Sequence, residues 1–313
     1  MSKISGIRQY IRQLALALAG AWLIVLAAAA PAPAFDTSLD DELLLLVNGK
    51  HTLPADYQPN DLVDTAGRAP SKKGVMQLRA AAAEAYVQMM ADYKAETGGK
   101  VYSISGFRTY AYQSRLFNSK LASRRNSGLS YGSAYKATVM YTALPGASEH
   151  QTGLAIDLST GSVLSESFRN TGAGKWLMAN CWDYGFILRY DEAKTDLTAI
   201  SYEPWHYRYV GLPHSLIIRD NNWVYEEYIS YLQENGSIEY ADPEQAGCVY
   251  RIYRTDDITD EYPGIVSVSS DNMGGYIITT HIDRLDDILT AWAEQAVRGG
   301  LIFFGHGALL NVF

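Results

Sequence analysis

Apolar residues recur at helical spacing through residues 75–96 of the sequence. They follow the i, i+3, i+4, i+7 pattern of one helix face, at Val75, Leu78, Ala82, Ala85, Tyr86, Met89 and Tyr93. Ser71 is a candidate start signal for this helix, and Gly98 with Gly99 a candidate stop. Three further segments predict helices: "YAYQSRLFNSKLA", "GKWLMANCWDYGF" and "NNWVYEEYISYLQEN".

Strands are indicated where apolar and polar residues alternate. In "GLAIDLS", Leu154, Ile156 and Leu158 alternate with Ala155 and Asp157. Because successive side chains of a strand point to opposite faces, the large apolar residues would enter a core and Asp157 would project from the other face. "KVYSISGF", "FILRY" and "YEPWHYRYVG" predict three more strands.

The remaining segments complete the predicted organisation. Residues 35–70 are expected to be an extended arm, and residues 123–146, rich in Ser, Gly and Tyr, a long loop beside the site. These elements together predict an α+β domain at 35–236. Beyond it, "GIVSVSS" and "GYIITTHI" predict a small β-rich accessory region at 237–313.

The first 34 residues have a different composition. Lys3, Arg8 and Arg12 precede an uncharged apolar run at 14–30, and an A-x-A-like site ends at Ala34. The run is close to the roughly 20 residues needed to span a bilayer. We therefore expect residues 1–34 to be a cleaved signal peptide or a retained membrane anchor. Either way the rest of the chain would lie outside the cytoplasm, facing the cell wall.

The overall composition is that of a globular protein, with 48% hydrophobic and 19% charged residues among 313. The net charge of −8 becomes −11 once the three basic residues of 1–34 are set aside, so nucleic acid is not an expected partner. Cys181 and Cys248 form no CxxC pair, and both one disulfide and two unrelated thiols remain open. A zinc site would have to use histidines and carboxylates.

Two histidines and two carboxylates form the candidate catalytic group. His206 begins a predicted strand, and Glu203 precedes a bend at Pro204 that lets it lean back toward His206. Two histidines and a carboxylate are a recurrent ligand set of catalytic zinc, which leaves a fourth position for water. We therefore predict His150, Asp157 and His206 as zinc ligands. Glu203 would be the base that takes a proton from that water.

Each of these residues also has a simpler interpretation. His150 and Asp157 alone could form a surface turn, and Glu203 could form an ion pair with His206. Arg108 alone could be an exposed loop residue. The occurrence of all of them in order favours the zinc site. The other histidines have no partners at ligand spacing and are expected to be structural: His51, His214, His281 and His306.

"SEHQTGLAID" and "EPWH" resemble the S-x-H-x-x-G-x-A-x-D and E-x-W-H signatures of the LAS-type zinc peptidases. The resemblance is greatest to VanY-like D-alanyl-D-alanine carboxypeptidases and covers roughly residues 43–235. It implies a compact α+β domain in which a small, mostly antiparallel sheet holds the metal. It also implies that bacterial peptidoglycan stem peptides are the substrate, and we expect the chain to act as a monomer.

"SGFRTYAYQ" extends this resemblance. In the family, an arginine at the position of Arg108 faces the scissile carbonyl, and a glutamine at the position of Gln113 helps to hold the substrate. Ser148 matches the family serine that hydrogen-bonds the substrate. Phe107 departs from the pattern, because tyrosine is common there, and this puts only a peripheral contact in doubt.

The predicted function is that of an exported zinc D,D-carboxypeptidase, which removes the terminal D-Ala from stem pentapeptides ending in D-Ala-D-Ala. The alternatives are an L,D-carboxypeptidase acting on tetrapeptide stems, an endopeptidase, and a hedgehog-like zinc-bearing binding module. Glu203 and Arg108 argue against the binding module, because binding alone needs neither. Substrate choice is expected to come from Trp205, the Phe107 region and residues 123–146. A role in glycopeptide resistance would depend on the neighbouring genes.

Overall fold

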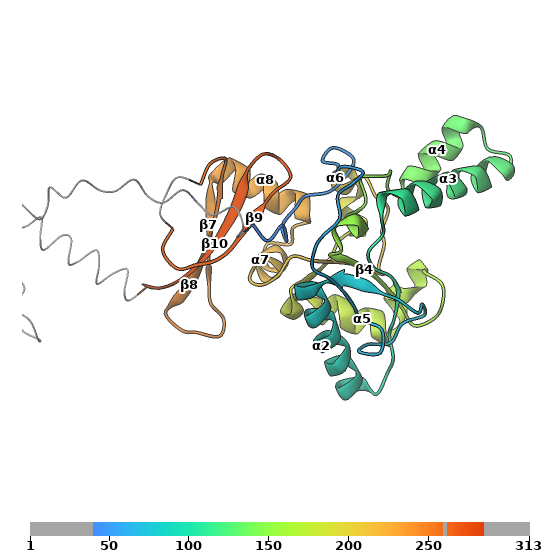
Figure 1. Cartoon of the computed structure of the whole chain (residues 1–313). Coiled ribbons are helices and arrows are strands. Elements are labelled where there is room, and N and C mark those ends of the chain that lie inside the picture. The colour runs from blue at the N-terminus through green and yellow to red at the C-terminus, as the bar shows by residue number, and fades with distance from the viewer. Residues whose placement is uncertain (1–39, 259–261, 285–313) are drawn as a thin grey trace, which may run out of the picture. The chain divides into compact units, whose positions relative to one another are not determined.

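The computed structural model describes residues 40–258 and 262–284 (Figure 1). The expected signal peptide or anchor at 1–34 lies outside these residues, as does the end of the accessory region. Residues 40–257 and 262–284 belong to one compact unit. None of the helices in the described ranges is both long and apolar enough to cross a membrane.

A four-stranded antiparallel sheet lies at the centre of the predicted domain. Its order is β3 (Tyr102–Ser105), β4 (Ala155–Ser159), β6 (His206–Tyr209) and β5 (Phe186–Leu188). All four strands fall in segments whose alternation predicted them. The predicted α+β class with an antiparallel sheet is confirmed.

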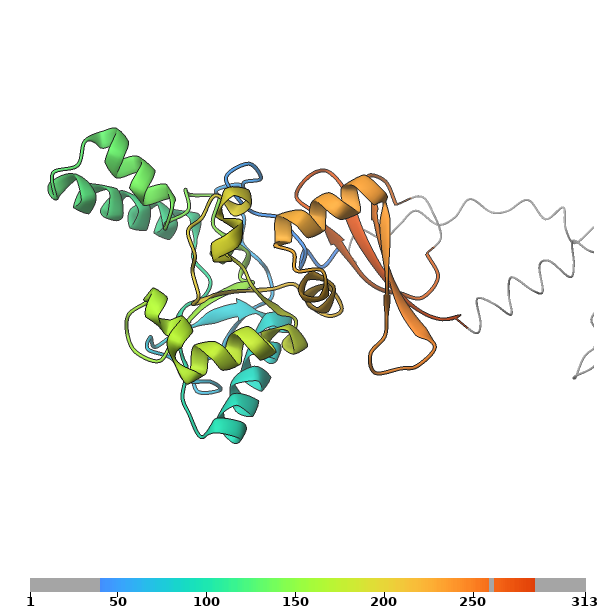
Figure 2. The ribbon, with the colours of Figure 1, turned by 180° about the vertical axis from the view of Figure 1, so that it is seen from behind.

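Two helices cover one face of β4. Side chains of α2 (Ala80–Thr97) and α5 (Gly172–Asn180) share a buried core with Ile156 and Leu158 of β4. Figure 2 shows both helices on the same side of this strand. Asp157, between Ile156 and Leu158, therefore projects from the opposite face, as the alternation predicted.

The α2 helix begins later than its apolar pattern predicted. Residues 77–79 form β2 (Gln77–Arg79), which pairs with β1 (Leu62–Asp64). The Arg79 N–H also donates to the carbonyl of Gly153, so the backbone is extended here and the helix begins at Ala80.

The expectation of a long loop over residues 123–146 is wrong. The helix α3 (Tyr110–Asn126) continues into this segment, and α4 (Tyr131–Val139) follows. Figures 1 and 2 show the two helices side by side as a hairpin. A small core of Phe117, Leu121 and Ala134 holds them together. The apolar residues of this core are few and come from two helices, so neither helix shows a clear apolar periodicity in the sequence.

The C-terminal part contains a second antiparallel sheet, in the order β7 (Ser237–Ala241), β8 (Cys248–Thr255), β10 (Tyr276–Asp283) and β9 (Ile265–Ser270). The predicted β-rich tail is thus confirmed up to residue 284, and the boundary at 236 stays a prediction. Ile252 and Ile277 of this sheet share a core with α7 (His214–Asp220) and α8 (Tyr225–Asn235). The remaining short helices are η2 (Glu149–Thr152), η3 (Glu166–Asn170), η4 (Cys181–Tyr184), η5 (Glu192–Lys194) and α6 (Thr195–Thr198).

Candidate active site

His150, Asp157 and His206 lie together in the folded chain. Asp157 of β4 and His206 of β6 are directly opposite one another in the sheet. His150 comes from η2, and one ligand atom from each of the three residues lies within 4.8 Å of the others. Asp157 Oδ2 is 3.3 Å from His150 Nε2, and Asp157 Oδ1 is 3.1 Å from His206 Nδ1. We call these three residues the metal-site residues.

The backbone fixes which nitrogen of His150 faces the site. His150 Nδ1 donates to the carbonyl oxygen of Gly106 at 2.7 Å, which leaves Nε2 as the atom directed at Asp157. Gly153 ends η2 with φ of 71°, and a Cβ there would lie 2.8 Å from Leu62 Cδ2, so the tight turn to β4 requires glycine. Burial, reinforced by the charge of Arg108, lowers the pKa of His150 to about 4. The imidazole is therefore neutral at pH 7, as a metal ligand must be.

His206 presents its other nitrogen to the site. Its Nδ1 faces Asp157, while Nε2 lies 3.5 Å from Glu149 Oε2. Burial disfavours a charge on His206, but the nearby carboxylates of Asp157 and Glu149 outweigh it and raise the pKa of His206 to about 9. A divalent cation would displace this proton, and its positive charge would interact with the carboxylates in place of the proton's charge.

These donors fit a zinc ion. His150 Nε2 and Asp157 Oδ1 are buried without a hydrogen-bond partner, which is costly unless a ligand satisfies them. Two imidazole nitrogens and one carboxylate are also a donor set that catalytic zinc takes.

Glu203 lies beside the metal-site residues. A turn at residues 204–205 brings the backbone N–H of His206 to the carbonyl of Glu203 at 3.0 Å. Glu203 Oε2 is then 3.6 Å from His206 Nδ1, as the predicted bend requires. The side chain is buried, and this burial raises the pKa of Glu203 to about 8, against the opposing charges of His206 and Arg108. Such a carboxyl group can both hold and release a proton near neutral pH.

The other predicted site residues line the same cavity, which has a volume of about 330 Å³. Arg108 is placed by its backbone N–H, which donates to the carbonyl of His150 at 3.0 Å. Burial lowers the pKa of Arg108, but the charges of Asp157 and Glu203 oppose this shift. Gln113 donates from Nε2 to the carbonyl of Ala143 at 2.7 Å, and its Oε1 has no hydrogen-bond partner. Ser148 is buried at the cavity wall.

Of the three regions expected to determine substrate choice, two line this cavity and one does not. Trp205 lines the cavity, as do Arg124 and Tyr141 from the 123–146 segment. Phe107 lines a neighbouring cavity instead, which it shares with Arg108 and Tyr112. The departure from tyrosine at position 107 therefore lies outside the wall of the main cavity.

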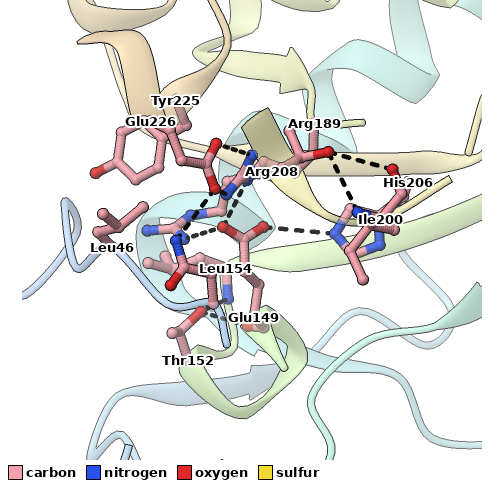
Figure 3. Close-up of polar contacts among 12 residues, drawn as sticks. Leu46, Glu149, Thr152, Leu154, Arg189, Ile200, His206, Arg208, Tyr225 and Glu226 are labelled. Atoms are coloured by element: carbon pink, nitrogen blue, oxygen red, sulfur yellow. Dashed lines mark hydrogen bonds and ion pairs between the residues drawn. The ribbon is translucent and has the colours of Figure 1, made fainter. Parts of the chain in front are cut away.

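Sequence reasoning missed a buried charge network behind His206. Figure 3 shows Glu149 between His206 and two arginines. Arg189 Nε and Arg208 Nη1 donate to Glu149 Oε1 at 2.8 and 3.0 Å, and all three side chains are fully buried. Burial alone would raise the pKa of Glu149, but the two guanidinium groups hold it well below its usual range. Glu149 is therefore an anion that faces a metal-site histidine.

The network continues away from the site. Arg189 also donates to both carboxylate oxygens of Glu226 on α8, at 2.7 and 2.6 Å. Arg208 Nη2 donates to the carbonyls of Leu43 and Leu45 in the predicted arm, each at 3.0 Å. A signal for this network was present in the sequence. Arg189 and Arg208 interrupt the apolar strand segments "FILRY" and "HYRYV", and a charge inside a buried strand needs an opposite charge.

Comparison with known proteins gives a consistent assignment. Residues 75–212 match the VanY D-alanyl-D-alanine carboxypeptidases. A D-alanyl-D-alanine carboxypeptidase of Enterococcus faecium is 35% identical over 247 residues, which are 75% of this chain and 74% of the relative.

Two solved structures are also similar. A VanY D,D-pentapeptidase mutant from a VanB-type resistance cassette, in complex with Zn(II), is 31% identical with a TM-score of 0.51, covering 60% of this chain and 99% of that chain. The LdcB LD-carboxypeptidase is 37% identical with a TM-score of 0.54, covering 60% of this chain and 86% of that chain.

The antiparallel sheet and its buried His-Asp-His group define a zinc-dependent carboxypeptidase. The chain belongs to the VanY family of D-alanyl-D-alanine carboxypeptidases. The resemblance carried by "SEHQTGLAID" and "EPWH" is thereby confirmed, and with it zinc as the cofactor.

Proposed function

We propose that this chain is an exported D,D-carboxypeptidase that removes the terminal D-alanine from peptidoglycan stem pentapeptides. The observation that carries the proposal is the grouping of the metal-site residues with Glu203 in one cavity of a VanY-family fold. Family membership and the relative from Enterococcus faecium support the D,D bond.

Each site residue has a distinct role in this proposal. His150, Asp157 and His206 would hold zinc, which would supply a water that loses its proton near pH 7 and a charge that polarises the scissile carbonyl. Glu203 takes a proton on its carboxylate and returns it to the leaving amine of D-alanine. The guanidinium of Arg108 stabilises the negative charge that develops on the carbonyl oxygen. Gln113 and Ser148 hold the substrate at the cavity wall.

The second candidate is an L,D-carboxypeptidase that shortens tetrapeptide stems. It is favoured by the similarity to LdcB, an LD-carboxypeptidase with 37% identity to this chain. Both substrates present a carbonyl and a terminal carboxylate to the same residues, so the metal site itself does not separate them. A misfitted methyl group costs only about 1–3 kcal/mol, and some turnover of the second substrate is therefore expected.

Mass spectrometry of stem peptides tests the choice of bond. Zinc-loaded protein is incubated with pentapeptide and tetrapeptide stems at equal concentration. The proposal predicts loss of one D-alanine from the pentapeptide, leaving a tetrapeptide. Conversion of tetrapeptides to tripeptides with pentapeptides untouched would establish the L,D activity in its place.

Export is the second part of the proposal, and it is supported by the basic residues and the apolar run at 1–34. Protease treatment of intact cells should digest the chain beyond residue 34. Complete protection until the cells are lysed would contradict export.

A further inference from the structure

The helical hairpin next to the active site carries positive charge only. Residues 97–148 contain seven basic and no acidic side chains, although the whole chain has a net charge of −8. Two of the seven, Lys120 and Arg124, belong to α3 and line the same cavity as the metal-site residues. Lys73 lines it as well. The cavity therefore has a cationic wall in addition to its carboxylate cluster.

Four of the cavity-lining residues of α3 form one stripe. Gln113, Leu116, Lys120 and Arg124 are spaced three, four and four residues apart, which places them on one face of the helix. We call these four residues the α3 stripe. At 1.5 Å per residue, Lys120 lies about 10 Å along the helix from Gln113, and Arg124 about 16 Å. An extended peptide advances about 3.3 Å per residue, so these distances correspond to about three and five residues of substrate.

Lys120 and Arg124 are available to a ligand. Within residues 40–258 and 262–284, neither takes part in an ion pair with a carboxylate of the chain. The contact of Arg124 is with the hydroxyl of Thr138, 3.5 Å from Nη1. Arg125, the next residue, is different: its guanidinium lies over the ring of Tyr131, and it does not line the cavity.

We propose that the α3 stripe binds the amino-side part of the substrate and selects stem peptides with a free carboxylate about three residues before the cut bond. The proposal rests on the proposed function, because it takes the scissile bond to lie at the metal-site residues and the substrate next to that bond to contact Gln113. A carboxylate at that distance would meet Lys120, with Arg124 about one helical turn further along α3, while its amide would offer no charge to either.

Three synthetic peptides test this inference on the zinc-loaded, full-length chain. The first is an acetylated stem pentapeptide with the free α-carboxylate on its second residue, and the second is its α-carboxamide. The third is the C-terminal tripeptide alone. The wild-type chain is expected to cleave the acid with a kcat/KM about threefold to tenfold above that of the amide, as two solvent-exposed ion pairs allow. This preference should shrink in 0.5 M salt.

Two variants separate the stripe from general surface charge. The double variant Lys120→Gln with Arg124→Gln should cleave the acid and amide peptides at equal kcat/KM. Arg125→Gln is the matched control and should retain the full preference. Equal kcat/KM for acid and amide in the wild-type chain, with the tripeptide cleaved, would refute the inference alone. A loss of preference in Arg125→Gln equal to that of the double variant would also refute it. Failure to cleave any of the three peptides would instead refute the proposed function and this inference with it.

Discussion

Glu203 lies 3.6 Å from His206 but is not needed to complete a three-residue ligand set. Glu203→Gln should therefore retain zinc while losing turnover, because the amide cannot accept the proton. Elemental analysis checks that zinc is retained, and kcat measured on the same preparation checks that turnover is lost. His206→Ala is the comparison, because it should lose the metal as well. Turnover near the wild-type rate in Glu203→Gln would show that another group is the base.

Arg108 is held at the cavity by its backbone bond to His150, and its guanidinium is attracted to the carboxylates of Asp157 and Glu203. Arg108→Ala should keep zinc and lower kcat/KM about a hundredfold or more, the usual cost of removing one preorganised oxyanion donor. Steady-state kinetics with a stem peptide measure this. A change in kcat/KM within experimental error would show that Arg108 does not contribute to catalysis.

Glu149 faces His206 Nε2, the ring nitrogen that is turned away from Asp157, and we expect it to orient this histidine. Glu149→Gln keeps the shape but removes the charge that faces His206 Nε2, so zinc affinity should fall about 10-fold to 100-fold. Competition with a chelator measures the affinity directly, without reference to turnover. Glu226→Gln is the matched control, because it disturbs Arg189 and leaves Glu149 in place. Equal zinc affinities of Glu149→Gln and the wild type would contradict the positioning role.

At the scale of the element, helix α7 contacts the C-terminal sheet through a buried histidine. His214 Nδ1 is 2.7 Å from the hydroxyl of Tyr228 on α8, and Nε2 is 3.1 Å from the hydroxyl of Thr279 on β10. Burial lowers the pKa of His214 to about 3. The structural role expected of this histidine agrees with these contacts.

This contact makes a pH-dependent contribution to stability. Well above pH 6.5, His214 is neutral in both the folded and unfolded chain. As the pH falls from 6.5 toward 3, the unfolded chain binds a proton that the folded chain does not, so the free energy of unfolding decreases. The variant His214→Gln has no histidine to titrate here, so it does not lose stability in this way. The difference in free energy of unfolding between wild type and this variant should therefore shrink by up to about 1.4 kcal/mol for each unit by which the pH falls. Urea unfolding at pH 7, 6 and 5 measures it, and a constant deficit would contradict the buried neutral state.

The strands and the metal-site residues could be predicted from sequence because their signals are local. Asp157 alternates with large apolar residues in one strand, and His206 follows a bend that Pro204 indicates. Most of α3 was predicted, but its end and the whole of α4 could not be predicted in the same way, since the hairpin core joins two helices with few apolar residues each. The start of α2 was also missed, because pairing with β1 overrides the helical pattern at residues 77–79.

At the scale of the whole molecule, the buried charge network joins parts that are far apart in sequence. Arg208 contacts the carbonyls of Leu43 and Leu45, and Arg189 contacts Glu226 on α8. Both arginines meet at Glu149, which faces His206 (Figure 3). The two arginines can be noticed in the sequence because they interrupt apolar strands, but a long-range network has no sequence period, so their partners become visible only when the chain is folded.

We propose that one zinc ion at His150, Asp157 and His206 enables this chain to cleave stem peptides. Zinc titration into chelator-treated protein, with D-alanine release measured at each step, tests it most directly. We expect no D-alanine release without metal, and a rise in release that reaches its plateau at one zinc per chain. Full D-alanine release from protein shown by elemental analysis to be free of metal would contradict it.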